Sequence, residues 1–279
     1  KIESKTIYNV KKINGMFKLI EKFEIKSHDG PGRVGKINDT ITPKLFFKND
    51  IKIAPYEGSA YNIDREIAQF NVKETLRLAK ENADKCNIAT IQGSKYIDLR
   101  VECLKELEKI GYNGFIIANS DELLLHPRDL SNMIVNLRKN MHPTSYLIFS
   151  FAEPSFMPLL AYMGVDGFLA DSSNYYSYLN VLLTPTKTYD LETYPIYENI
   201  TRDELEEKNI ETLNFVINNL GYLDAILTCG EREIQAHMKN SSLRNLVEER
   251  SLTNPQNVSA LKILDKEHEN YLLEYSQLF

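Results

Sequence analysis

Cysteine is scarce in this chain of 279 residues, and its three thiols lie far apart. Cys86, Cys103 and Cys229 form no CxxC pair and no other spacing that is typical of a zinc site. We therefore expect no bound metal and no other cofactor. Dispersed thiols are typical of a reducing compartment, which favours a cytoplasmic protein.

Long apolar runs are also missing. No run reaches the roughly 18 residues of a membrane-spanning helix, and no stretch has the pattern of a secretory signal peptide. The sequence therefore predicts no membrane partner. Hydrophobic residues still make up 43% of the chain, which is enough for the core of one large barrel or two small domains.

The chain lacks a general excess of positive charge. Its formal net charge of −6 argues against a surface coated with basic residues for nucleic-acid binding. Residues 1–60 nevertheless carry 12 Lys or Arg and 7 Asp or Glu, a net +5 that leaves −11 for the rest. This basic part is either a surface that meets phosphate groups or a solvated, lysine-rich terminus.

Strands and helices alternate in the hydrophobic pattern from residue 62 onward. We expect helices over residues 63–82, 96–110, 127–140 and 156–163. We expect strands over residues 23–26, 33–37, 44–47, 87–91, 114–118, 146–149 and 166–170. Past Pro195 only helices are expected, over about 201–219, 231–238, 242–250 and 255–275. Such alternation is typical of parallel βαβ units.

The number of strands limits the fold. A complete eight-stranded barrel usually needs ~250 residues, whereas only about 170 precede the helical tail. The sequence predicts an α/β protein with a TIM-type (β/α) barrel, shortened or incomplete, in residues 1–195. A helical C-terminal segment, residues 196–279, is expected to pack on it.

The run Thr90–Arg100 joins a predicted strand to a predicted helix through Gln92, Gly93 and Ser94. A βα barrel binds its ligand at such junctions. The Gln92 amide offers a donor and an acceptor to a purine edge, and a glycine lets the backbone approach a flat ring. The alternative is an ordinary turn between strand and helix.

This run resembles the QG segment of tRNA-guanine transglycosylases, above all those of archaea. The resemblance extends from about residue 23 to residue 279. It rests on five segments in the family's order, at residues 23–36, 90–107, 164–168, 183–192 and 243–250. It implies a barrel that acts on tRNA and holds a 7-deazaguanine-type base with Gln92 and Gly93.

Two departures from the family pattern bear on activity. The attacking Asp of an active transglycosylase follows a G-V-D-x-F strand, and here Leu169 occupies that position. Asp171, two residues later, would share its face if the strand continued, and is a weak catalytic candidate. The early D-S-G-x-F-Q segment, which supplies the family's other catalytic Asp, and the clustered zinc cysteines have no counterpart.

The runs at residues 119–130 and 153–166 resemble a paralogous branch, archaeosine synthase. That branch implies action on tRNA that carries 7-cyano-7-deazaguanine, with conversion of the nitrile to an amidine. Its later P-C-…-K-P-Y motif and its PUA domain have no match here. The chain is therefore expected to be either one subunit of a split enzyme, whose second subunit carries these parts, or a shortened relative. Self-association and the amino donor stay open.

Further polar residues follow the next strands. Asn119 and Ser120 either border the ligand-binding mouth or cap a helix. Glu153 is a second weak catalytic candidate, with a solvated loop carboxylate as the alternative. The tyrosines of residues 175–178 either stack on bases or pack in an interface or the core.

We therefore predict an archaeosine synthase-like protein that acts on tRNA. One rival is an active transglycosylase that exchanges a base and uses Asp171. The other is a non-catalytic partner subunit that binds tRNA for another chain.

Overall fold

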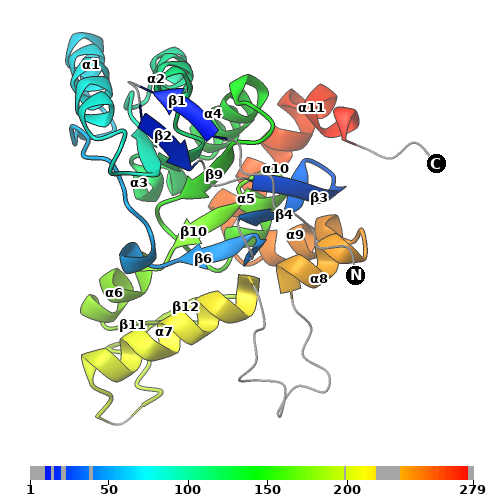
Figure 1. Ribbon diagram of the computed structural model, residues 1–279. Helices are drawn as coiled ribbons and strands as arrows, with labels where there is room; N and C mark the ends of the chain where they lie inside the picture. Colours follow the sequence, from blue (N-terminus) through cyan, green and yellow to red (C-terminus); the bar gives the residue numbers. More distant parts are fainter. Residues whose placement is uncertain are drawn as a thin grey trace, which may run out of the picture.

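A parallel five-stranded sheet forms the centre of the protein, in the order β6-β10-β9-β8-β7 (Figure 1). The structure, a computed structural model, describes residues 10–13, 16–19, 23–37, 40–197, 199–217 and 233–275. The parallel strands are β6 (Lys44–Phe46), β7 (Ile88–Ile91), β8 (Gly114–Ile117), β9 (Tyr146–Phe149) and β10 (Gly167–Leu169). Each was expected from its apolar run.

Helices alternate with these strands, as predicted, and two further short helices, over residues 120–124 and 171–178, were not expected. The connecting helices are α1 (Arg65–Glu81), α2 (Ile97–Ile110), α3 (Ser120–Leu124), α4 (Pro127–Asn140) and α5 (Met157–Tyr162), and α6 (Asp171–Tyr178) follows β10. Helix α2 ends at Gly111, whose φ of 113° lies in the left-handed region that favours glycine. Helix α4 begins at Pro127, which needs no helical hydrogen bond at that position.

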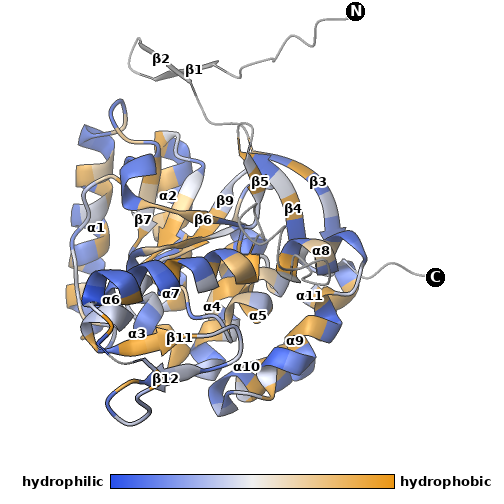
Figure 2. Ribbon diagram, turned by 90° about the horizontal axis from the view of Figure 1, so that it is seen from below, coloured by the Kyte–Doolittle hydropathy of each residue, from blue (hydrophilic) through white to orange (hydrophobic). Residues whose placement is uncertain are grey.

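The central sheet is buried on both faces, which explains its continuous apolar strands. One face packs against the helices, with Phe115, Leu147 and Phe168 among its buried residues. The opposite face forms a separate apolar cluster, contributed by Phe23, Ile37, Phe46, Ile51, Ile88, Ile116, Tyr146, Ile148 and Leu169. The parallel strands are accordingly largely hydrophobic in Figure 2.

The parallel α/β arrangement is confirmed, but the described strands form no closed barrel. Strands β6 and β7 are the edges of the sheet and do not pair with each other. An isolated parallel bridge between Ile53 and Ile88 extends the β7 edge. The chain therefore passes from one edge to the other within residues 47–52, through the 3-10 turn η1 (Lys48–Asp50). Five strands and a bridge are too few for the eight-stranded arrangement.

Antiparallel strands precede the parallel sheet. They are β1 (Val10–Ile13), β2 (Met16–Leu19), β3 (Phe23–Asp29), β4 (Gly32–Ile37) and β5 (Thr40–Thr42). Phe23 and Ile37, from β3 and β4, belong to the apolar cluster on the sheet face that does not meet the helices. Strands β3 and β4 lie beside α8 (Glu233–Lys239) in Figure 2.

The C-terminal part is helical, with one difference from prediction. After α7 (Arg202–Ile217) and α8 come α9 (Leu243–Ser251), α10 (Pro255–Glu267) and α11 (Glu269–Glu274). The last two were expected as one helix. They separate at His268, which has non-helical angles (φ −123°, ψ 26°) and a ring nitrogen 2.8 Å from Asn132 Oδ1 of α4. None of the described helices combines the length and apolar content needed to cross a bilayer.

A short hairpin, β11 (Val181–Leu183) and β12 (Thr188–Asp190), lies where no strand was expected. Helix α7 packs on α6 and on β11 (Figure 1), while α9 and α10 pack on α5 and α4. Contacts therefore run across residue 195, and the division of the chain at that position stays a prediction.

Candidate functional site

A pocket of about 450 Å³ lies beyond the carboxyl ends of β8, β9 and β10. This edge of a parallel sheet is where α/β proteins bind their ligands. Its charged lining consists of three carboxylates and no lysine or arginine: Asp121, Glu122 and Glu153. Its aromatic lining consists of Phe151, Phe156, Tyr175 and Tyr176. We call this the carboxyl-edge pocket.

Glu153 is the buried carboxylate of the carboxyl-edge pocket, with 7% of its surface exposed. Its Oε2 accepts a hydrogen bond of 2.6 Å from Ser155 Oγ. Burial raises the pKa of Glu153 above its ordinary value of 4.5, and hydrogen bonds from Ser155 and Phe156 oppose that rise. A carboxyl group whose pKa moves toward neutrality is suited to give and take protons.

Aromatic rings form a wall next to Glu153. Phe151 lies 5.6 Å from Tyr175 and 5.5 Å from Tyr176 between ring centroids. Burial, and secondly the charge of Glu153, raise the pKa of Tyr176, so its hydroxyl stays protonated. Tyr178 instead lies 72% exposed, with the Arg202 guanidinium 5.3 Å from its ring. Two of the three predicted tyrosines thus offer a surface on which a flat ring can stack.

The predicted base reader Gln92 lies 1% exposed, and its side-chain amide bonds within the protein. Its Nε2 donates to the Glu57 carbonyl oxygen at 2.7 Å, and its Oε1 accepts from the Gly93 amide at 2.9 Å. Gly93 has φ 147°, and a Cβ there would meet Arg100 at 2.7 Å. In this conformation the amide holds residues 57–59 against the turn.

Arg100, which the sequence reasoning did not single out, organises the same turn. It is fully buried and donates to the carbonyl oxygens of Ser94 (2.7 Å), Ala118 (2.8 Å) and Ile91 (3.2 Å). Burial lowers its pKa to about 10, so it remains a cation at neutral pH. A signal was present, because Arg100 shares the predicted buried face of the helix with Cys103 and Leu107, three and seven residues later.

Asn119 and Ser120 belong to this hydrogen-bond network. Asn119 Nδ2 donates to the Ser59 carbonyl oxygen at 2.8 Å, and Ser120 Oγ donates to the Ile117 carbonyl oxygen at 2.8 Å. Ser94 Oγ lies 3.2 Å from Ser59 Oγ. The structure thus links the predicted base-binding residues Gln92, Ser94 and Asn119 to residues 57–59. None of the five predicted residues lines the carboxyl-edge pocket, and their contact with a base stays a prediction.

The two catalytic candidates differ in position. Strand β10 ends at Leu169, Ala170 is already helical (φ −73°, ψ −13°), and Asp171 begins α6 with an exposed side chain. The strand therefore does not continue to Asp171, because α6 starts first. Leu169, which the family resemblance places at the position of the attacking Asp, packs in the apolar cluster of the sheet. Glu153 faces the carboxyl-edge pocket, and Asp171 is not among its lining residues.

Segments that carried the family resemblance meet one another in space. Arg33 Nε donates to Asp166 Oδ1 at 3.0 Å, across 133 positions of sequence. Arg250 Nη1 donates to the Pro185 carbonyl oxygen at 2.8 Å. These contacts join β4 to the start of β10 and α9 to the loop after β11, so this part of the shared pattern stabilises the fold.

Within the described residues, no group of three or more His, Cys, Asp or Glu is arranged to hold a metal ion. Cys103 is a buried free thiol, and the Cys86 Sγ lies 3.6 Å from the Ile53 carbonyl oxygen. Cys229 lies outside the described residues.

A model of the family described as queuine tRNA-ribosyltransferase matches residues 8–207. The chain belongs to this family. The expected resemblance to tRNA-guanine transglycosylases is therefore confirmed, and tRNA is the substrate of the family.

Members of two kinds are similar to this chain. A tRNA-guanine(15) transglycosylase of Methanocaldococcus jannaschii is 29% identical over an alignment of 230 residues that covers 74% of this chain and 34% of that protein. The transglycosylase of Pyrococcus abyssi is 30% identical over an alignment of 228 residues that covers 76% of this chain and 38% of that protein. The archaeosine synthase subunit alpha of Thermococcus kodakarensis is 22% identical over an alignment of 277 residues that covers 91% of this chain and 43% of that protein.

Identity is thus higher with the transglycosylases, whereas more of the chain aligns with the archaeosine synthase subunit. The chain spans about a third to two fifths of the length of the relatives it matches.

Proposed function

We propose that this chain acts on tRNA that already carries 7-cyano-7-deazaguanine, and that it takes part in converting the nitrile to an amidine without exchanging the base. The proposal rests on the chemistry at two positions, one apolar and one acidic. Leu169 is apolar where an exchanging enzyme needs its attacking Asp, whereas Glu153 supplies a buried carboxyl group in the carboxyl-edge pocket.

Base exchange needs a nucleophile that bonds to the ribose C1′ while one base leaves and another enters. A leucine side chain has no lone pair for this step. Asp171, two residues after Leu169, begins α6 with an exposed side chain and does not lie on the strand. These positions support chemistry on the base itself over cleavage of its bond to the ribose.

Nitrile conversion needs a proton carrier. The amine nitrogen bonds to the nitrile carbon, one π bond of the nitrile opens, and a proton moves from the amine nitrogen to the former nitrile nitrogen. A carboxyl group with a raised pKa can accept the first proton and return it to the second nitrogen. Glu153 is suited to this role, and the rings of Phe151, Tyr175 and Tyr176 are suited to hold a flat base beside it.

The first test measures base exchange. The purified chain is incubated with tRNA and radiolabelled guanine, and we expect no incorporation. Stoichiometric incorporation that is lost in Asp171→Asn would contradict the proposal and favour an active transglycosylase.

The second test measures nitrile conversion. Cyano-deazaguanine tRNA is incubated with the chain and a panel of amines, ammonium and free amino acids included, and the nucleosides are weighed by mass spectrometry. We expect Glu153→Gln to slow conversion by about 10²–10⁴-fold. Asp121→Asn, which changes an exposed carboxylate of the same pocket, should have little effect. Selective binding of the modified tRNA with no conversion would indicate the non-catalytic partner subunit instead.

A further inference from the structure

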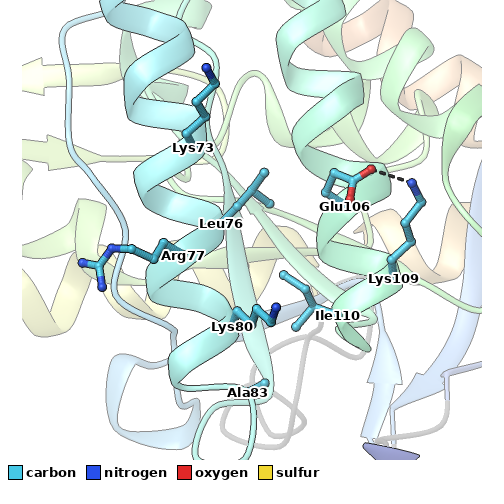
Figure 3. A pocket seen from close by; sticks show the side chains of 8 residues that line it. All are labelled: Lys73, Leu76, Arg77, Lys80, Ala83, Glu106, Lys109 and Ile110. Atoms are coloured by element: carbon cyan, nitrogen blue, oxygen red, sulfur yellow. Dashed lines mark hydrogen bonds and ion pairs between the residues drawn. The ribbon is translucent and has the colours of Figure 1, made fainter.

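A second hollow, away from the carboxyl-edge pocket, lies between α1 and α2. It has a volume of about 520 Å³ and is lined by Lys73, Leu76, Arg77, Lys80, Ala83, Glu106, Lys109 and Ile110 (Figure 3). We call it the α1–α2 groove. Its floor is apolar, since Leu76 and Ile110 approach each other from the two helices, and its rim carries four cations and one carboxylate.

Two of the four cations are available to a ligand. Lys73 and Lys80 are exposed, and within the described residues neither forms an ion pair. Arg77 is held by Glu74 and Glu81 and points away from α2 in Figure 3. Lys109 pairs with Glu106, the carboxylate of the groove, and remains 71% exposed.

The spacing of the free lysines suits a polymer of regularly placed anions. Lys73 and Lys80 are seven residues apart in one helix, so they lie on one face and about 10 Å apart along its axis. Lys109 stands on the facing helix across the groove. This concentration of positive charge contrasts with a chain whose net charge is −6.

We propose that the α1–α2 groove binds the phosphate backbone of RNA. The groove presents ammonium groups and no aromatic ring, so it is equipped to neutralise phosphates and not to stack or read bases. The carboxyl-edge pocket has the opposite character, with carboxylates and rings and no lysine or arginine. The two surfaces therefore divide the recognition of one tRNA between backbone and base. This inference rests on the proposed function for the identity of the RNA.

The test uses the full chain, an unmodified tRNA transcript and a titration at several salt concentrations. Each phosphate contact contributes about 0.7–0.9 to the slope of log K against log salt, so Lys73→Gln/Lys80→Gln should flatten that slope by about 1.4–1.8. We expect the affinity of this double variant for the tRNA transcript at low salt to be about tenfold lower than that of the wild type. The matched control, Lys262→Gln/Lys266→Gln, removes two exposed lysines from α10 and should bind like the wild type. Thermal melts establish that both variants are folded.

Each other outcome overturns the inference. Unchanged RNA binding by the groove variant would mean that the groove meets a different partner, such as an acidic protein. Equal losses in the two double variants would mean that general charge, and not this groove, binds RNA.

The failure of this proposal is distinguishable from that of the proposed function. The Lys73→Gln/Lys80→Gln variant should lose affinity by the same factor for unmodified tRNA and for cyano-deazaguanine tRNA. Glu153→Gln should slow the conversion of cyano-deazaguanine tRNA and should not change the binding of unmodified tRNA.

Discussion

The amino and the carboxyl ends of the parallel strands form two opposite edges of the central sheet. Each of these edges contains a buried carboxylate in a different setting. At the amino edge, Asp166 precedes β10 and is fully buried. It forms an ion pair with Arg33 and accepts a hydrogen bond of 2.9 Å from the Leu147 amide. At the carboxyl edge, Glu153 follows β9 and is 7% exposed. Within the described residues no lysine or arginine pairs with it, and burial raises its pKa.

This contrast separates a carboxylate that stabilises the fold from one that we propose to be functional. The charge of Asp166 is matched by a cation and joins β4 to the sheet, so it contributes to the fold. An unpaired buried carboxyl group costs stability, and such groups cluster at functional sites. The family pattern includes Asp166 in its G-V-D-x-F segment, whereas Glu153 was only a weak candidate in the sequence.

Removing the charge of Asp166 at the amino edge should have the largest effect on the free energy of unfolding. Asp166→Asn keeps the shape of the side chain but leaves the Arg33 guanidinium buried without its counter-charge. We expect the free energy of unfolding to fall by about 3–5 kcal/mol, as for other buried ion pairs that lose one partner. Urea denaturation measures the loss.

The matched control is Asp98→Asn, which removes the carboxylate of an exposed pair with Arg65. Its effect on unfolding should be small because solvent screens exposed pairs. Similar losses in the two variants would contradict the assignment of Asp166 as the organising charge.

An intermediate loss of stability is expected from the hydrogen-bond network around Gln92 at the carboxyl edge. Gln92→Ala removes the bonds to the Glu57 carbonyl and the Gly93 amide. Leaving such groups unpaired costs about 1–3 kcal/mol, and urea denaturation again measures it. The opposite result, unchanged stability with a selective loss of binding to cyano-deazaguanine tRNA, would make Gln92 a base reader and not a turn residue.

Glu153→Gln should have the smallest effect on the free energy of unfolding. Unlike the two changes above, it should raise that free energy. Because the folded state raises the pKa of Glu153, wild type is most stable below the unfolded value near 4.5 and loses stability as pH rises through the folded pKa. Glutamine does not titrate, so the stability of the variant relative to wild type should increase as the pH rises from the unfolded to the folded pKa of Glu153. Unfolding free energies of both proteins between about pH 4 and pH 8 test this. A difference that does not change with pH would show that Glu153 is not the buried titrating group.

The order and type of the parallel elements were predictable because their signals are local. Residues 127–140 form the predicted helix, with Pro127 at its start, and residues 146–149 form the predicted strand. Such signals weaken for short or composite elements. The three-residue strands of the β11–β12 hairpin escaped prediction, and the break at His268 depends on contact with Asn132 of another helix.

The candidate site was predictable only in part. The sequence by itself determined that polar residues follow β7, β8 and β9, and its resemblance to the family predicts that Leu169 stands at the position of the nucleophile. It did not indicate that Gln92 would turn toward Glu57, 35 positions earlier, or that Glu153 would be buried beside Tyr176.

Only the tertiary structure decided these roles. Hydrogen-bond partners, burial and the resulting pKa of a group depend on residues that are distant in sequence, such as Arg33 and Asp166, which lie 133 positions apart. Hydrophobic periodicity reports which face of an element is buried, but not which element covers it. The sequence thus determined the alternating elements and the family, whereas folding decided which carboxylate is neutralised and which one faces a pocket.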